Sequence, residues 1–259
     1  MVNSWITKSI ELANMKNYLD RLHAVYPLEI GGERDIDASS INAIQTAHRN
    51  QDAISLVKAL LDLDRFPIDY PYASLVRQKT NLIELNPETI KMIAIPLLRM
   101  DFSKLLTHCM TPKPANTKMG PLFHNYVRSL GYPILSNSDF EDAHGIAFLD
   151  GTDRDLQIYA NNELDCSLRK GLDALFKIDD DFYIGEAKFF SSGGGNQAKA
   201  FDEALDFLGA HRGTATRIAI LDGVVWFDNL NQKMQREIRR QDSVALSALL
   251  LKDYIDSVS

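Results

Sequence analysis

Three charged side chains in the second half of the chain have the types and spacing of a cation-binding site. Asp173 lies in the apolar run 172–176. Glu186 and Lys188 follow a second apolar run, 182–184. If both runs are strands, Glu186 and Lys188 point to the same face, because the side-chain period of a strand is two. Charged side chains within apolar strands cost free energy unless they are paired or coordinate a metal. The pattern therefore predicts a divalent-cation site with a lysine beside it.

Two carboxylates and a lysine suit metal-dependent cleavage of a phosphodiester. Mg²⁺ prefers carboxylate oxygens and shares its coordination shell with substrate phosphate. Asp173 and Glu186 are the candidate metal ligands, and the backbone carbonyl of Ala187 is a further candidate. Lys188 would position or help to deprotonate the attacking water, and would stabilise charge developing on phosphorus. The alternative interpretation is a surface aspartate and a solvent-exposed Glu–Lys ion pair.

Two short strands and the turn between them must position these residues. Residues 172–178 and 182–188 have the composition and length of strands, and three aspartates, 179–181, stand between them. Such a hairpin brings Asp173 and Glu186 to the same end of a sheet. The three aspartates then form the solvated tip of the hairpin, away from the metal site.

The order of these residues resembles the PD-(D/E)XK nuclease signature. Gly171-Leu172-Asp173 is followed, after a strand and a turn, by Ile184-Gly185-Glu186-Ala187-Lys188. The Glu-Ala-Lys segment, followed by a glycine-rich loop and Gln197, is similar to type II restriction endonucleases. The resemblance implies that the two acids bind metal, that the lysine is catalytic, and that the reaction is Mg²⁺-dependent hydrolysis of DNA.

Two positions depart from the family pattern. Leu172 stands where the signature's namesake has proline, which puts little in doubt. Many family members carry an acid on the preceding helix, but residues 122–130 contain none and have a histidine in the middle. A further metal ligand therefore stays unassigned, with Glu163 and Asp165 as candidates. The scattered histidines show no metal-pair spacing and are interpreted as structural: His124, His144 and His211.

Polar and basic residues around the expected site are candidate DNA contacts. The glycine-rich segment 191–197 precedes a helix, where backbone N–H groups can approach phosphate oxygens. Its alternative role is a flexible connection capped by Asn196. A dense basic run lies on an expected C-terminal helix, although such runs are usually solvated faces. The predicted DNA-contacting residues are Arg169, Lys170, Asn196, Gln197, Lys199, Lys233, Arg236 and Arg240.

The composition is that of an ordinary globular protein with an excess of acid. The 259 residues are 45% hydrophobic and carry a formal net charge of −7. Residues 1–115 hold 13 basic and 13 acidic residues, whereas residues 116–259 hold 15 and 22. A negative balance argues against a nucleic-acid partner, but an acidic half that contains the expected site suits divalent-cation binding.

Targeting signals are missing from the sequence. No apolar run approaches the roughly 20 residues of a membrane span, and the N-terminus has no signal-peptide pattern. Two distant cysteines, Cys109 and Cys166, indicate free thiols in a reducing compartment. We therefore expect a cytoplasmic protein without a membrane partner.

Helical spacing dominates the first part of the chain. Residues 111–116 are the expected linker, because proline, lysine and asparagine interrupt the periodicity there. The expected domains are residues 1–115, a helical region for DNA recognition or dimerisation, and residues 116–259, the catalytic domain. Two prolines keep residues 66–72 out of a regular helix. The expected helices of this region lie within residues 4–25, 37–49, 51–63, 86–100 and 101–110.

The second part of the chain mixes helices and strands. Its predicted elements, in order, are a helix over 120–130, the hairpin, a helix over 197–211, strands over 217–221 and 224–227, and helices over 229–240 and 242–258. This order predicts an α/β fold in which helices flank a mixed central sheet, as in a restriction-endonuclease-like core.

The residues and the resemblance together imply a type II restriction enzyme, a sequence-specific endonuclease of double-stranded DNA. A chain with one such site needs two copies to cut both strands, so we expect a two-fold homodimer. The resemblance also implies functional pairing with a DNA methyltransferase. Two alternatives stay open: a repair or junction-specific nuclease on the same core, and a DNA-binding module without catalysis.

Overall fold

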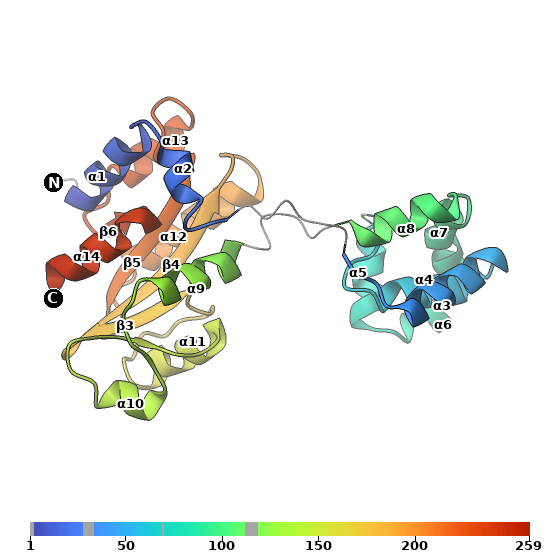
Figure 1. Cartoon of the computed structure of the whole chain (residues 1–259), viewed down its shortest axis with the longest axis horizontal. Coiled ribbons are helices and arrows are strands. Elements are labelled where there is room, and N and C mark those ends of the chain that lie inside the picture. Colours follow the sequence, from blue (N-terminus) through green and yellow to red (C-terminus); the bar gives the residue numbers. More distant parts are fainter. Residues whose placement is uncertain (1–2, 28–33, 69, 112–118) are drawn as a thin grey trace. The chain divides into compact units, whose positions relative to one another are not determined.

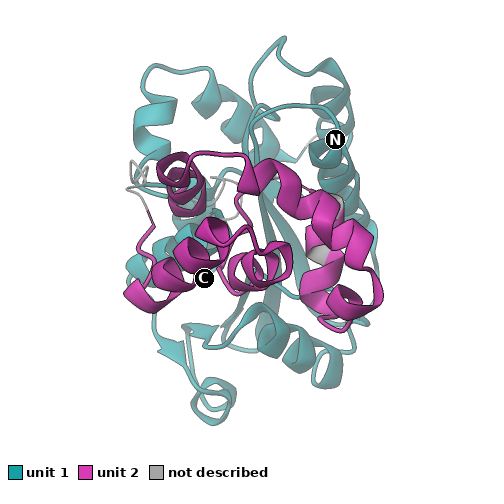
Figure 2. Cartoon of the chain, turned by 90° about the vertical axis from the view of Figure 1, so that its right-hand side faces the viewer, with its two compact units in different colours: residues 1–27, 115–259 teal, residues 28–114 magenta. Residues whose placement is uncertain are grey.

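The chain folds into two compact units, which the computed structural model describes over residues 3–27, 34–68, 70–111 and 119–259 (Figure 1). Unit 1 comprises Met1–Pro27 and Ala115–Ser259, and unit 2 comprises Leu28–Pro114 (Figure 2). The second break between the units falls beside the expected boundary at residues 115 and 116. The first break differs from expectation, because the first 27 residues belong to unit 1 rather than to one helical region over 1–115.

Unit 1 has a mixed sheet at its centre. Within the described residues its strands are β1 (Ile134–Leu135), β2 (Ile146–Leu149), β3 (Ala174–Ile178), β4 (Asp181–Phe190), β5 (Thr216–Gly223) and β6 (Val244–Leu246). Its helices are α1 (Ser4–Ala13), α2 (Tyr18–Leu22), α9 (Met119–Ser129), α10 (Asn137–Glu141), α11 (Asp153–Asn162), α12 (Asn196–Gly209), α13 (Gln232–Ile238), α14 (Leu251–Val258) and the 3-10 turn Ala248–Leu250.

The strands lie side by side in the order in which they occur along the chain. β1 and β2 are parallel, β2, β3 and β4 are antiparallel, and β4, β5 and β6 are parallel. The predicted mixed sheet flanked by helices is therefore confirmed. The predicted hairpin is present as well, with Ala174 opposite Gly185 and Ile178 opposite Asp181. Asp179 and Asp180 form its turn, at the end away from Asp173.

The two faces of the sheet pack against different helices. One face carries a row of rings across β2, β3 and β4, with centroids 5.0 and 4.8 Å apart: Phe148, Phe176 and Tyr183. Apolar side chains of α1, α2, α9 and α14 join this core. Leu175 and Ile184 alternate to the opposite face, where they pack with α11. Asp173 and Glu186 lie two residues from that pair, so they share its face.

The N-terminal helices belong to unit 1 because their side chains are buried there. Ile6 is fully buried in the core of the sheet. The hydroxyls of Tyr18 and Tyr26 donate to the two carboxylate oxygens of Asp222 at 3.1 and 3.0 Å, and the Ser247 hydroxyl donates at 2.5 Å. Asp222 is itself fully buried, and burial raises the pKa of its carboxyl to about 6. This network fastens the N-terminal segment to β5.

The predicted strand over residues 224–227 is wrong. β5 continues through Asp222 and ends at Gly223, whose φ of +89° redirects the chain. A side chain at Gly223 would place its Cβ 2.0 Å from the carbonyl oxygen of Phe190, so the turn requires glycine. Trp226 then packs in the core and donates its indole N–H to the carbonyl of Leu221.

The predicted helix over residues 242–258 is also wrong in its first part. Val244–Leu246 form the edge strand β6, which pairs in parallel with β5 through Ala219 and Ala245. The α-helix begins only at Leu251. A three-residue strand has too few positions to show an alternating pattern, so pairing with β5 decides its structure.

Unit 2 is helical throughout its described secondary structure. Its helices are α3 (Ala38–Arg49), α4 (Ala53–Leu61), α5 (Pro71–Gln78), α6 (Leu82–Leu85), α7 (Pro87–Leu98) and α8 (Phe102–Met110). Their apolar side chains form a separate core. Helix α5 was not expected, but Pro71 occupies its first turn, where a missing N–H costs nothing. In neither unit does a described helix combine the length and the apolar character that a membrane span needs.

Candidate active site

The first residue of the candidate site is held at the start of the hairpin. The Asp173 N–H donates to the carbonyl of Gly185 at 3.1 Å, and its carboxylate accepts the N–H of Ala187 at 2.8 Å. A Cβ at Gly185 would lie 3.3 Å from the Cβ of Ala174 and 3.1 Å from Ile220, so glycine allows this close strand packing. Backbone and side chain of Asp173 are therefore both fixed against β4.

Lys188 joins the two predicted metal ligands. Its Nζ lies 3.1 Å from Oε1 of Glu186 and 3.6 Å from Oδ2 of Asp173. The side chains are 31%, 12% and 15% exposed, so the three charges interact largely out of water. Burial lowers the pKa of Lys188, but the carboxylates of Asp173 and Glu186 outweigh that effect and raise it. At neutral pH Lys188 is thus an ammonium group that neutralises one of two neighbouring acids.

The backbone of Ala187 faces the same place. In a β-strand the N–H and C=O of one residue point to the same side. Because the N–H of Ala187 points to the carboxylate of Asp173, its carbonyl oxygen lies on the Asp173 side as well. The structure thus brings together Asp173, Glu186, Lys188 and the Ala187 backbone. Their catalytic and metal-binding roles stay predictions.

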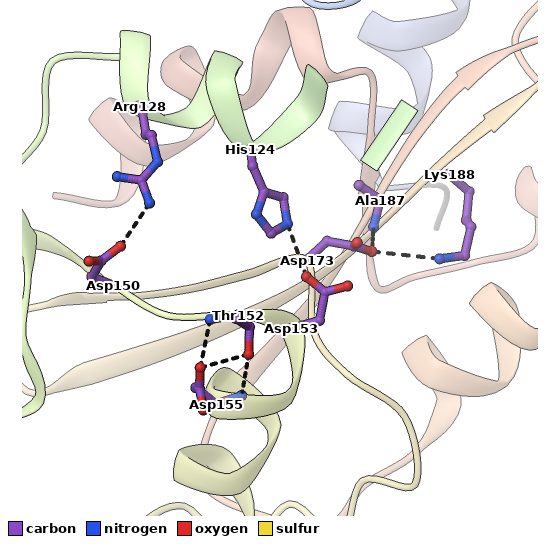
Figure 3. A network of polar contacts seen from close by, with 9 residues as sticks. All are labelled: His124, Arg128, Asp150, Thr152, Asp153, Asp155, Asp173, Ala187 and Lys188. Carbon is purple, nitrogen blue, oxygen red and sulfur yellow. Dashed lines mark hydrogen bonds and ion pairs between the residues drawn. The ribbon is translucent and has the colours of Figure 1, made fainter. Parts of the chain in front are cut away.

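Two side chains that were not predicted as metal ligands lie beside Asp173. His124 Nε2 on α9 lies 3.3 Å from Oδ1 of Asp153, the first residue of α11. Ligand atoms of His124, Asp153 and Asp173 all fall within 4.8 Å of one another. Asp173 lies between this pair and Lys188 (Figure 3). His124 was expected to be structural, and its neighbours here show that it faces the candidate site instead.

Glu163 and Asp165, the predicted candidates for a further metal ligand, follow the C-terminal end of α11, whereas Asp153 is at its N-terminal end. Ten helical residues separate their ends by about 15 Å. The sequence signal for Asp153 was the capping box, in which the side chains of Thr152 and Asp155 bond to each other's backbone N–H groups. That box places a helix N-terminus, and with it Asp153, beside the hairpin.

The predicted DNA-contacting basic residues lie near acidic partners. Lys170 and Lys199 both contact Glu203 on α12, at 2.5 and 3.8 Å. Lys233 contacts Asp202 at 3.5 Å. Arg236 and Arg240 share Glu237 at 3.7 and 3.3 Å, so one acid offsets only one of these two charges. For Arg169 the described residues provide no such acid.

The glycine-rich loop is closed by its own side chains. Gln197 accepts the N–H of Ser192 at 2.8 Å and donates to the hydroxyl of Ser191 at 2.8 Å. Gly195, with a φ of +57°, precedes the helix, and exposed Asn196 is its first residue rather than its cap. Gln197 thus has a structural role in the loop, and Asn196 is open to solvent.

A pocket of about 540 Å³ adjoins the candidate site. Arg169, Lys170, Arg212 and Arg217 line it, together with the acidic residues Glu186, Glu203 and Asp206. The site therefore opens onto a space bordered by basic as well as acidic side chains.

One of the comparisons with known proteins identifies the family of the chain. The family model of the Tsp45I type II restriction enzyme matches residues 3–258, almost the whole chain. No curated protein and no solved structure gives a significant match. The mixed sheet with flanking helices is consistent with a restriction-endonuclease-like core. The matched range includes both units and every residue of the candidate site, and the chain belongs to the Tsp45I family of type II restriction enzymes.

Proposed function

We propose that this restriction enzyme cleaves double-stranded DNA by Mg²⁺-dependent hydrolysis at the Asp173–Glu186–Lys188 site. The observation that carries the proposal is the position of one ammonium group between two largely buried carboxylates, at 3.6 and 3.1 Å. Membership of the family supports a sequence-specific endonuclease with DNA as substrate.

The residues at this place fit a hard divalent cation. Asp173 and Glu186 offer carboxylate oxygens, and Ala187 offers a carbonyl oxygen directed to the same side of β4. Oxygen donors of this kind are what Mg²⁺ prefers, and it usually keeps several waters besides. When bound there, Mg²⁺ would lower the pKa of a coordinated water and offset negative charge on the phosphate.

Besides the metal ion, Lys188 would provide a positive charge at the cleavage site. Its ammonium group would hydrogen-bond the attacking water and a non-bridging phosphate oxygen, and so orient the water in line with the leaving 3′ oxygen. Charge increases on those phosphate oxygens during attack, so a fixed cation stabilises the transition state more than the ground state. Asp173 and Glu186 hold this cation in place through their contacts with Nζ.

The basic residues around the pocket would bind the DNA backbone. Exposed ion pairs contribute only about 0–1 kcal/mol each, so a phosphate can replace Glu203 as the partner of Lys170 and Lys199. Arg169 can contact phosphate without giving up such a partner. We extend the same role, with Asn196, to Lys233, Arg236 and Arg240, but not to Gln197, whose amide already closes its own loop.

Cutting both strands would then require two copies of the chain, because each contains one such site. A homodimer, a paired DNA methyltransferase and a cytoplasmic location are parts of the same proposal. Unit 2 would provide target contacts or dimer contacts.

Digestion of a plasmid in the presence of Mg²⁺ tests the proposal. The wild-type protein should give fixed fragments, and Lys188→Ala should give none while still binding DNA. Lys252→Ala is a matched control, since Lys252 is an exposed lysine of α14 that pairs with Asp256. Cleavage only of branched or mismatched DNA would favour a repair or junction nuclease. Binding without cleavage by the wild type, under varied metals, would favour a non-catalytic module.

A further inference from the structure

A second group of ligand atoms lies on the other side of Asp173. His124 comes from α9, Asp153 from the start of α11, and Asp173 from the segment before β3, yet their ligand atoms lie within 4.8 Å of one another. Lys188 and Ala187 contact Oδ2 of Asp173. Its Oδ1 has no hydrogen-bond partner among the described residues, so this oxygen is open to a further ligand.

The three side chains are held in place by structure outside the group. The carbonyl of Asp153 accepts the N–H of Leu172 at 3.0 Å. Gly171 packs so closely that an added Cβ would lie 2.6 Å from the Cβ of Asp153. The capping box of α11 fixes the backbone on the other side of Asp153. Asp153 and Asp173 are therefore kept close by the chain segment that joins Gly171 to the hairpin.

This proximity is electrostatically unfavourable without a further cation. Asp153 and Asp173 each contribute a negative charge, and the one nearby ammonium group, Lys188, is shared between Asp173 and Glu186. Like charges a few ångströms apart repel, and the repulsion is stronger where water is partly excluded. A divalent cation between His124, Asp153 and Asp173 would offset the repulsion between the two aspartates.

The donor set distinguishes this place from the all-oxygen set around Glu186. An imidazole nitrogen favours first-row transition metals, whereas Mg²⁺ and Ca²⁺ prefer oxygen alone. The carboxylates suit Mn²⁺ as well. We infer that His124, Asp153 and Asp173 form a second cation site that takes Mn²⁺ in preference to Mg²⁺. The inference rests on the proposed function only in that Asp173 is shared by both cation positions.

Spectroscopy of bound Mn²⁺ in the full-length protein tests the inference directly. Pulsed electron paramagnetic resonance should detect coupling between Mn²⁺ and an imidazole nitrogen in the wild-type protein. The coupling should vanish in His124→Ala and persist in His144→Ala, which removes an exposed histidine elsewhere on unit 1. Calorimetric titration should show Mn²⁺ binding at least about tenfold weaker in His124→Ala, with Mg²⁺ binding changed less than about threefold.

A second variant guards against misfolding of the first. Asp153→Asn keeps the shape of an exposed side chain and removes one negative charge, so it should also weaken Mn²⁺ binding. Circular dichroism of both variants should match the wild type. Absence of nitrogen coupling in the wild type, or its persistence in His124→Ala, overturns the inference. Plasmid cleavage with Mg²⁺ is measured separately. Cleavage without coupling removes only this inference, and coupling without cleavage removes only the proposed function.

Discussion

The two units of the chain differ in what they bury. Among the described residues, the buried polar and charged side chains all lie in unit 1: Ser9, Lys177, Arg217, Asp222, Gln235 and Ser247. The core of unit 2 is apolar, and three of its aspartates stand at helix starts, where Asp37, Asp52 and Asp101 cap α3, α4 and α8. Buried polar groups cost free energy unless each finds a partner. Unit 1 meets that cost with specific long-range bonds, and unit 2 avoids it.

The difference indicates a division of labour within the restriction enzyme. A site for cleavage needs charged groups held out of water in fixed positions, and within the part of the chain that the structure describes it is unit 1 that has buried hydrogen bonds of this kind. Unit 2 has a self-contained helical core without such groups, which suits a part that presents an outer surface. The following changes test whether catalysis, stability and titration are divided between the units in this way.

The largest effect is expected from Glu186→Gln in unit 1. The substitution keeps the side-chain shape but removes a predicted metal ligand and a partner of Lys188, so the single-turnover rate of DNA cleavage should fall by roughly 10³-fold. Glu84→Gln in unit 2 replaces an exposed glutamate of α6 and should leave the rate unchanged. A comparable loss in both variants would contradict the assignment of catalysis to unit 1.

The second effect concerns independent stability. Leu97 is fully buried in unit 2, so Leu97→Ala should lower the free energy of unfolding of that unit by about 2–5 kcal/mol. Both tryptophans, Trp5 and Trp226, lie in unit 1. In Leu97→Ala, the urea midpoint measured by tryptophan fluorescence should therefore stay near that of the wild type. Part of the helical signal in circular dichroism should be lost at a lower urea concentration than in the wild type.

The converse variant is Phe176→Ala, which removes a fully buried ring of β3 in unit 1. It should shift the fluorescence transition by about 3–5 kcal/mol and leave the transition of unit 2 in place. A single transition that moves in both variants and with both probes would mean that the units unfold together.

Sequence reasoning succeeded where the pattern was local. Glu186 and Lys188 are two residues apart on one strand, and the hairpin that brings Asp173 to them has a two-residue turn. Their proximity follows from strand alternation and a tight turn alone. The helices within residues 38–61 and 87–110 were likewise predicted from helical spacing along the chain.

Sequence reasoning failed where a contact joins distant segments. His124 and Asp153 reach the site from two helices, and the capping box beside Asp153 marks the start of a helix, not a metal ligand. Asp222 followed by glycine has the composition of an exposed turn, yet it is buried by tyrosines about 200 residues earlier in the chain. Such positions are decided by packing of the whole unit, which a single sequence does not display.

The third expected effect concerns the buried carboxylate of Asp222. Asp222 accepts hydrogen bonds from Tyr18, Tyr26, Ser247 and the N–H of Ala248. In Asp222→Asn one acceptor oxygen becomes a donor, and the Ala248 N–H or a hydroxyl loses its partner. Unit 1 should lose about 1–3 kcal/mol at pH 7, measured by urea unfolding with tryptophan fluorescence. Asp228→Asn, at an exposed position near the same strand, is the control.

The pH dependence of the same pair of proteins has a defined sign. The pKa of Asp222 is about 6 in the folded protein and about 3.9 in an unfolded chain. Between those values the folded protein holds a proton that the unfolded chain has released, so wild-type stability falls as pH rises. Asp222→Asn lacks this contribution. Its unfolding free energy should therefore fall further below that of the wild type near pH 4 than at pH 7, by up to about 3 kcal/mol. A difference from the wild type that grows as pH rises would contradict the raised pKa of Asp222.

The smallest effect tests the surface aspartates of unit 2. Asp52 accepts the N–H groups of Ile54 and Ser55 at the start of α4, so Asp52→Ala removes a helix cap and should slightly lower the free energy of unfolding of unit 2. Asp62 follows the last residue of the same helix, where a negative charge opposes the helix dipole, and Asp62→Ala should be neutral or slightly stabilising. Both are measured by urea unfolding followed by circular dichroism.

The two aspartates should also differ in their response to acid. Hydrogen bonds from Ser55 hold the pKa of Asp52 below its usual value. Its contribution is therefore complete above the ordinary pKa near 3.9 and declines as pH falls through the lower folded value. The loss of unfolding free energy in Asp52→Ala should therefore become smaller in acid. The loss in Asp222→Asn should become larger in acid, because the wild-type Asp222 carboxyl stabilises the fold most when it is neutral. Opposite pH slopes of the two mutational losses would distinguish unit 2, which is stabilised by exposed carboxylates at helix ends, from unit 1, which contains a buried carboxyl group.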